Sequence, residues 1–134
     1  MADVIQQKIS FTASPATLFN LYLDSKKHGA AIEDKVSISR KVGSRFTAFG
    51  GMVRGRTLMI VPDRLIVQSW RANSWKKNDP DSVLILRFNR AKNGGRITLL
   101  QVNVPTHAYR NITHGWRKHY WAPWKAYLRT QCSD

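Results

Sequence analysis

The sequence has one cysteine, Cys132, so an intramolecular disulfide bond is excluded. No apolar run approaches the roughly 20 residues that a membrane-spanning helix needs. The N-terminal segment MADVIQQKIS contains neither the basic region nor the apolar region of a signal peptide. These absences favour a soluble protein of a reducing compartment, and we expect a cytoplasmic location.

Carboxylates are scarce as well. The sequence contains eight Asp and Glu residues but 22 Lys and Arg residues, which gives a formal net charge of +14. Between Ser82 and Ser133 there are nine basic residues and no acidic one. Such a surface attracts acidic proteins, nucleic acids or anionic membranes through electrostatic steering, unless it serves solubility alone.

Catalytic signatures are also missing. The sequence contains no HExxH, CxxC or GxSxG motif and no glycine loop of the kind that cradles phosphate. The four histidines lack metal-ligand spacing, so we expect them to be structural or solvated. The sequence therefore predicts no catalytic residue, no metal site and no cofactor site.

What is present suits a single globular domain covering residues 1–134. Apolar residues make up 43% of the chain, and five Trp, four Tyr and five Phe can fill a core. Residues 4–11 alternate like a strand, and Ser14-Pro15 is typical of a helix start. A short helix to Leu23 should follow, then a turn or second short helix over residues 24–31.

From residue 33 onward the apolar period changes to two, which predicts a run of antiparallel strands. Turn signals separate them at Gly50-Gly51, Pro62-Asp63 and Asn93-Gly94-Gly95. Residues 73–81 are expected to form a loop. The expected strands lie near residues 36–38, 45–49, 52–61, 64–71, 82–90 and 96–104.

A long C-terminal helix is predicted over residues 107–129. Its apolar residues recur at helical spacing and should form one buried stripe: Tyr109, Ile112, Trp116, Tyr120 and Tyr127. The opposite face gathers cations: Arg110, His114, Arg117, Lys118, Lys125 and Arg129.

Three residues of this helix depart from the simple pattern. An α-helical wheel places Trp121 among the cations rather than on the buried stripe. Gly115 and Pro123 lower the helical propensity, so we expect an early weak point in the helix and a bend near Trp121 to Pro123. The order of elements predicts an α+β fold, in which a curved antiparallel sheet of six to seven strands wraps around the long helix. Two short helices should follow the first strand.

Several strings along the chain are those of a known family. They are Ser14-Pro15 with Leu18-Phe19, the segment GSRFTAFGG from Gly43, Val61-Pro62 through Trp70-Arg71, Trp75, Gly94-Gly95, and the ending with Val104-Pro105, Gly115-Trp116, Tyr120-Trp121 and Tyr127-Leu128. In order and spacing they resemble the C-terminal domain of the activator of heat-shock-protein-90 ATPase, in the START-like (SRPBCC) helix-grip superfamily. The resemblance covers essentially the whole chain, although Trp75 is followed here by Lys76-Lys77 rather than by proline.

The resemblance implies a non-catalytic binding module whose partner is an acidic protein such as the heat-shock-protein-90 chaperone. Aromatic residues set among cations are typical of such contacts. The candidate partner-binding residues are Trp75, Lys76, Lys77, Arg110, Arg117, Lys118, Trp121 and Lys125.

Two alternatives remain open from the sequence. Helix-grip folds often leave a cavity between helix and sheet, so the chain is alternatively a carrier or sensor of a small hydrophobic ligand. Trp70, Phe88, Trp116 and Tyr120 are the candidate lining residues, unless these large side chains simply fill the core. The further alternative is nucleic-acid binding through the basic surface, although no RNA-module motif is present.

Overall fold

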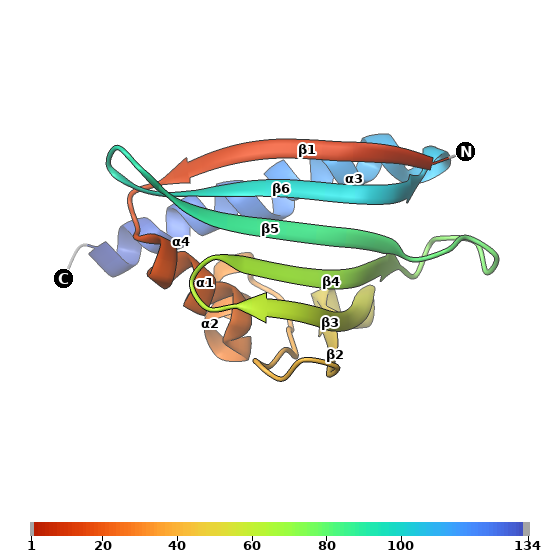
Figure 1. Ribbon diagram of the computed structural model, residues 1–134, viewed down its shortest axis with the longest axis horizontal. Coiled ribbons are helices and arrows are strands. Elements are labelled where there is room, and N and C mark those ends of the chain that lie inside the picture. Colours follow the sequence, from red (N-terminus) through yellow and green to blue (C-terminus); the bar gives the residue numbers. More distant parts are fainter. Residues whose placement is uncertain (1, 133–134) are drawn as a thin grey trace.

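Six antiparallel strands form one sheet in the order β1-β6-β5-β4-β3-β2, and the helices lie on one of its faces (Figure 1). The computed structural model describes residues 2–132, without the side chains of residues 2, 131 and 132. The strands are β1 (Ala2–Phe11), β2 (Arg45–Ala48), β3 (Val53–Val61), β4 (Leu65–Ala72), β5 (Ser82–Ala91) and β6 (Gly94–Pro105).

Two short helices, α1 (Pro15–Leu23) and α2 (Ser25–Ile32), follow β1, as the sequence predicts. Ser14 caps α1, because its hydroxyl accepts the Thr17 N–H at 3.1 Å, and Pro15 occupies the first turn. Asp24 caps α2 in the same way, and its carboxylate accepts the Lys27 N–H at 2.9 Å. The backbone bond lowers the pKa of Asp24.

The strand expected near residues 36–38 is wrong, and the sheet has six strands, within the predicted range of six to seven. Only an isolated bridge joins Ser37 to Thr47. The reason lies in Ser25, whose hydroxyl accepts the Ile38 N–H and donates to the Ile38 carbonyl, both at 2.8 Å. Since these backbone groups are occupied by a side chain, they are not available for a ladder.

The inward faces of the strands pack on α1 and on the C-terminal helix. Leu84, Leu86, Phe88, Ile97 and Leu99 alternate along β5 and β6 and are at most 2% exposed. The alternation along the strands therefore determines which of their side chains fill the core.

Close approach of β3 to β4 requires glycine at position 55, because a Cβ there would lie 1.8 Å from the Ser69 carbonyl oxygen.

The C-terminal helix is continuous in the chain but changes its hydrogen bonding. It comprises a short 3₁₀ turn η2 (Thr106–Ala108), α3 (Tyr109–Gly115), a π-helical segment η3 (Trp116–Trp121) and α4 (Ala122–Cys132). The Ala122 N–H donates to the Arg117 carbonyl, five residues back, and Pro123, which has no N–H, follows directly. The π segment begins at Trp116, directly after Gly115, where α3 ends. The bend near Trp121 to Pro123 stays a prediction.

The π segment also corrects the expected position of Trp121. Residues five apart lie about 140° apart on an α-helical wheel, but i→i+5 bonding brings them onto one face. Trp116 and Trp121 accordingly stack, with ring centroids 5.5 Å apart and planes at 15°. Trp121 is 3% exposed, so it belongs to the core and not to the cationic surface.

The remaining outer residues of this helix are placed as expected: Arg110, His114, Arg117, Lys118, Lys125 and Arg129 are all exposed. The buried stripe is confirmed in part, since Trp116 and Tyr120 are buried while Tyr109, Ile112 and Tyr127 are half-buried. The architecture confirms the predicted α+β fold, a curved sheet around a long C-terminal helix, which is consistent with the helix-grip fold.

Candidate functional site

Aromatic rings occupy the space between the helix and the sheet. Trp70, Phe88, Trp116 and Tyr120, the four candidate cavity residues, are each at most 4% exposed. The ring centroids of Trp70 and Trp116 are 5.9 Å apart, and those of Trp116 and Tyr120 are 4.7 Å apart. Phe88 meets Phe19 edge to face at 5.6 Å. Trp116 therefore contacts both Trp70 and Tyr120, and Phe88 packs on α1 instead.

Trp124 is the large core residue that the sequence pattern missed. It is fully buried and lies within 6.3 Å, centroid to centroid, of five rings: Phe11, Tyr22, His28, Tyr120 and Trp121. The signal that was available is its position four residues after Tyr120, a spacing that places both side chains on one helical face.

Four surface hollows lie elsewhere. One groove runs between α2 and β2, two flank the β5–β6 turn, and one lies on the outer face of the sheet. None of these four is lined by Trp70, Phe88, Trp116 or Tyr120. A ligand role for those four residues stays a prediction.

A hydrogen-bonded polar ladder crosses the buried interior beside Trp124. The Tyr22 hydroxyl donates to Gln68 Oε1 at 2.7 Å, and Gln68 Nε2 donates to Thr57 Oγ1 at 3.2 Å. His28 Nδ1 lies 2.7 Å from the Tyr22 carbonyl oxygen, and its Nε2 lies 2.9 Å from the Tyr120 hydroxyl. Because a carbonyl only accepts, Nδ1 carries the proton and Nε2 accepts from Tyr120.

The charge states in this ladder follow from its burial. Burial lowers the pKa of His28 to about 4 and raises the pKa values of Tyr22 and Tyr120 well above their ordinary value. All three groups are neutral near pH 7. His28 is therefore a buried, hydrogen-bonded histidine held between a backbone carbonyl and a phenol, an arrangement that fixes the ring rather than activating a nucleophile.

Glutamines connect the C-terminal helix to the sheet through two further buried bonds. The Trp116 indole N–H donates to Gln101 Oε1 at 2.8 Å, and the Trp121 indole N–H donates to Gln7 Oε1 at 2.9 Å. Gln7 Nε2 in turn donates to the Thr113 carbonyl at 3.0 Å. The sequence carried a signal for these residues, since each glutamine stands at an inward position of an alternating strand.

Two indole N–H groups have no such partner. Nε1 of Trp75 and Nε1 of Trp124 are buried and lack a hydrogen-bond acceptor among the described residues. A buried donor without an acceptor costs about 1–3 kcal/mol. These atoms mark two places in the interior where an added acceptor would be stabilising.

The described residues include no group of three or more His, Cys, Asp or Glu side chains that could hold a metal ion. No helix in the part of the chain that the structure describes is both long and apolar enough to span a membrane.

The loop between β4 and β5 is tightly ordered around Arg71. The Arg71 guanidinium pairs with Asp81 at 2.8 Å, donates to the carbonyls of Asp79 and Lys76, and lies 5.9 Å from the centroid of the Trp75 ring. Hydrogen bonds in which the donor or acceptor is charged are stronger than those between neutral groups. Arg71 thus organises the whole loop.

Asp79 ties the same loop to the start of the C-terminal helix. Its carboxylate accepts the Lys76 N–H at 2.8 Å and pairs with His107 Nε2 at 2.7 Å. The contact with His107 lowers the pKa of Asp79. The loop is therefore fixed at both ends.

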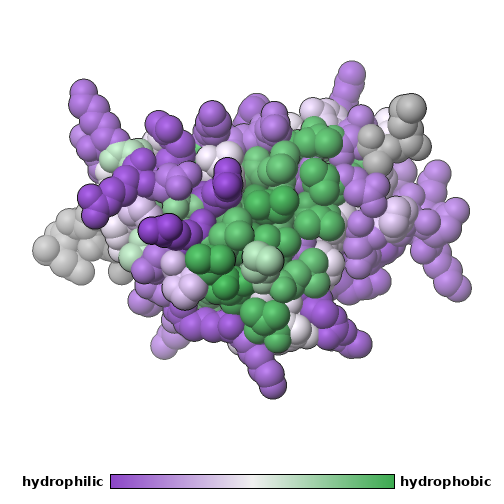
Figure 2. Space-filling model, in the orientation of Figure 1, coloured by the Kyte–Doolittle hydropathy of each residue, from purple (hydrophilic) through white to green (hydrophobic). Residues whose placement is uncertain are grey.

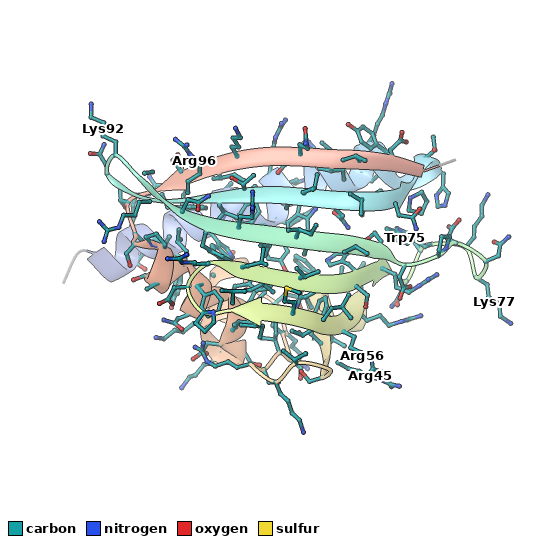
Figure 3. All side chains as sticks on the ribbon, in the orientation of Figure 1. Arg45, Arg56, Trp75, Lys77, Lys92 and Arg96 are labelled. Carbon is teal, nitrogen blue, oxygen red and sulfur yellow. The ribbon has the colours of Figure 1, made fainter. Side chains whose placement is uncertain are left out.

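Trp75 points into the core and corrects a second expectation. Its indole is 6% exposed and its centroid lies 5.7 Å from that of Trp70. Trp75 is an anchor of the loop rather than an exposed contact, whereas Lys76 and Lys77 next to it are exposed. Figure 3 shows Lys77 projecting from this end of the molecule.

The structure does not bring all predicted partner residues together. Lys125 lines a groove of about 520 Å³ with Lys92, Arg96 and Arg129, beside the β5–β6 turn. In Figure 3 Lys92 and Arg96 lie at the opposite end of the molecule from Lys77. Lys125 is thus at the other end of the sheet from Lys77.

Comparisons with known proteins agree with this architecture. A curated protein from Dictyostelium discoideum, "Activator of 90 kDa heat shock protein ATPase homolog", is 23% identical over 114 residues, which is 85% of this chain. The match spans 30% of that relative's length.

Solved structures at low sequence identity share the fold. An HSP90 activator from Plasmodium falciparum superposes with a TM-score of 0.83 at 22% identity, covering 96% of both chains. A protein from Mesorhizobium loti gives 0.82 at 16% identity, covering 98% of this chain and 99% of that one. CalU16 from Micromonospora echinospora gives 0.72 at 19% identity, covering 98% and 76%.

The sequence itself matches one family over residues 12–129, from the end of β1 to the last turn of α4. That range contains the ordered Arg71 loop, the buried polar ladder and the aromatic layer under the helix. With the fold shared and nearly the whole domain matched, the chain belongs to the Activator of Hsp90 ATPase homolog 1-like family.

Proposed function

We propose that the chain is a non-catalytic protein-binding module that contacts an acidic face of the heat-shock-protein-90 chaperone. The observation that carries the proposal is the loop of residues 73–81. Its two carboxylates, Asp79 and Asp81, contact His107 and Arg71, and Lys76 and Lys77 beside them are exposed. Family membership supports the choice of partner, because relatives are described as activators of this chaperone.

The order of the loop explains how it would bind. Lys76 and Lys77 are displayed by a backbone already fixed by Arg71, Asp79 and the buried Trp75 ring. Little conformational entropy is lost when such a loop meets its partner. Preferential binding to one conformer of the chaperone would then shift its population toward that conformer.

The test is isothermal titration of purified chaperone with the wild-type chain and with Lys76→Glu/Lys77→Glu. The double variant should bind at least about tenfold more weakly, because two attractive charges become repulsive toward an acidic face. Lys26→Glu/Lys27→Glu on α2 is the matched control, since it reverses an adjacent pair of exposed lysines on another element. Equal weakening by both pairs would show a general charge effect and contradict the assignment of the site.

A second function, binding of a small apolar ligand beneath the helix, is favoured by the unpartnered indole N–H of Trp124. A ligand with one acceptor atom would satisfy this buried donor. Apolar ketones and fatty acids would be titrated while the Trp124 indole N–H resonance is followed by NMR, with Trp124→Phe as the control for assignment. An unmoved resonance throughout the series would remove this function.

A further inference from the structure

The face of the sheet opposite the helices has no element packed over it among the described residues (Figure 1). Its centre is apolar. The register places Met59, Val67, Ile85 and Leu100 side by side across β3, β4, β5 and β6. Met59 is 50% exposed, and the other three are half-buried.

The apolar area extends beyond this row. Val83 and Val102 are paired in the neighbouring row of β5 and β6 and are also half-buried. Figure 2 shows a continuous hydrophobic band across this face between hydrophilic margins. The surface is also hollowed, with a depression of about 760 Å³ whose lining combines Leu65, Val67, Ile85 and Leu100 with polar side chains that include Gln6 and Thr98. We call Met59, Val67, Val83, Ile85, Leu100 and Val102 the outer sheet face.

Cations border the outer sheet face on both sides. Lys8 and Arg87 line the depression at one margin. At the other margin Arg45 and Arg56 are paired across β2 and β3, both are exposed, and both are labelled in Figure 3. Of the six strands, only β1 contains a carboxylate, Asp3.

Large apolar areas rimmed by polar residues mark interaction sites, and the charges indicate the kind of partner. A second copy of the chain is disfavoured as the partner of this face. A symmetric contact would bring the arginine margins of two copies together, and each copy carries a net charge of +14. A lipid surface is disfavoured because no Phe, Tyr or Trp accompanies the outer sheet face, whereas membrane-interface proteins use such residues as anchors.

Arginine favours a protein partner. Three of the four bordering cations, Arg45, Arg56 and Arg87, are arginines, whose planar guanidinium binds carboxylates through two parallel bonds. Arginine is enriched at protein interfaces and lysine is depleted there.

We propose that the outer sheet face is a docking surface for an acidic partner protein that presents an apolar ridge bordered by carboxylates. The inference deepens the proposed function and rests on it for the identity of the partner, the heat-shock-protein-90 chaperone. It adds a second contact that is separate from Lys76 and Lys77. The outer sheet face would bury apolar area against the partner, and the loop would contribute charged contacts.

The test compares Ile85→Glu and Ile85→Thr with wild type by isothermal titration of the purified chaperone. Ile85→Glu places a repulsive carboxylate at the centre of the apolar row, so affinity should fall at least about tenfold. Ile85→Thr keeps a β-branched side chain and the strand propensity of the position. It therefore tests the loss of apolar contact even if Ile85→Glu does not fold. Val42→Glu is the matched control: Val42 is 54% exposed and lies in the loop before β2, and its replacement should change affinity less than about twofold.

Each outcome decides a different point. Loss of binding in both Ile85 variants with retention in Val42→Glu supports the docking surface, even if Lys76→Glu/Lys77→Glu binds normally. Sensitivity to the lysine pair with no effect at Ile85 overturns the docking surface and leaves the proposed function in place. Failure of the wild-type chain to bind the chaperone overturns both. A dimer of the wild-type chain in sedimentation experiments that Ile85→Glu abolishes, or binding to anionic vesicles alone, also overturns the proposed occupant.

Discussion

Acid should destabilise the protein through His28, a buried residue remote from the proposed binding surfaces. Both of its ring nitrogens are engaged, and the groups that face it are Tyr22, Tyr120 and the Trp124 ring, none of which carries charge near neutrality. Protonation would place a cation in this interior and remove the acceptor that Nε2 offers to the Tyr120 hydroxyl. The folded protein therefore resists protonation of this ring.

The magnitude follows from the pKa difference between the two states. The pKa of His28 falls from 6.5 to about 4 on folding. Because the folded-state value is the lower one, the unfolded chain binds more protons between these limits, and stability decreases as pH falls from about 6.5 toward 4. At 1.36 kcal/mol per pKa unit, the free energy of unfolding should be about 2 kcal/mol lower at pH 4.5 than at pH 7 from this residue alone.

Urea denaturation followed by tryptophan fluorescence at these two pH values would measure the effect. His28→Gln is the matching variant, because an amide can donate to the Tyr22 carbonyl and accept from Tyr120 but does not titrate. The variant should be less stable than wild type at pH 7, and its stability should fall by about 2 kcal/mol less on acidification.

His114→Gln is the control, since it makes the same substitution at an exposed residue of α3. Equal pH dependence in wild type and His28→Gln would refute the reasoning. So would an NMR titration that gave His28 an ordinary histidine pKa in the folded protein.

Three further predictions concern stability in urea. Trp121→Ala should lower the free energy of unfolding by about 3–5 kcal/mol, because it removes a stacked core ring and leaves Gln7 Oε1 without its donor; a change below about 1 kcal/mol would mean that Trp121 is a surface residue after all. Gly115→Ala should raise stability by about 0.5–1 kcal/mol, since the added Cβ meets only His119 at 3.9 Å and alanine favours the helix; a loss would mean that the helix needs glycine there. Gly55→Ala should lower stability by about 3 kcal/mol, and a stable variant would show that β3 and β4 can separate.

Alternation along the strands was sufficient to predict most of the sheet. Inward positions such as Leu84, Leu86 and Phe88 follow from the period of two, which is a property of the extended backbone and does not depend on neighbours. The segment near Ile38 failed because a side chain from α2, the Ser25 hydroxyl, takes both backbone groups of Ile38. A bond between segments 13 residues apart is not visible in local periodicity.

The candidate partner residues were only partly predictable. Lys76 and Lys77 are exposed as expected, but Trp75 turns inward because Arg71 and Asp79 fold the loop back on itself. Lys125 lies far from them because the helix runs the length of the sheet. Which cationic side chains lie close together depends on how the helix and the strands are arranged in space. The spacing of these residues along the sequence does not contain that information.

The amino-acid sequence by itself determined the fold class, the inward and outward sides of the strands, the excess of positive charge and the family. These follow from local backbone geometry and composition. Only the tertiary structure decided that Trp121 is buried, that His28 is neutral, and that an apolar outer sheet face is left between two cationic margins. The buried indole of Trp121 donates its N–H to Gln7 on β1, a strand more than a hundred residues away in the sequence. The pKa of His28 depends on its burial, and the outer sheet face is left open because the described helices pack on the opposite side.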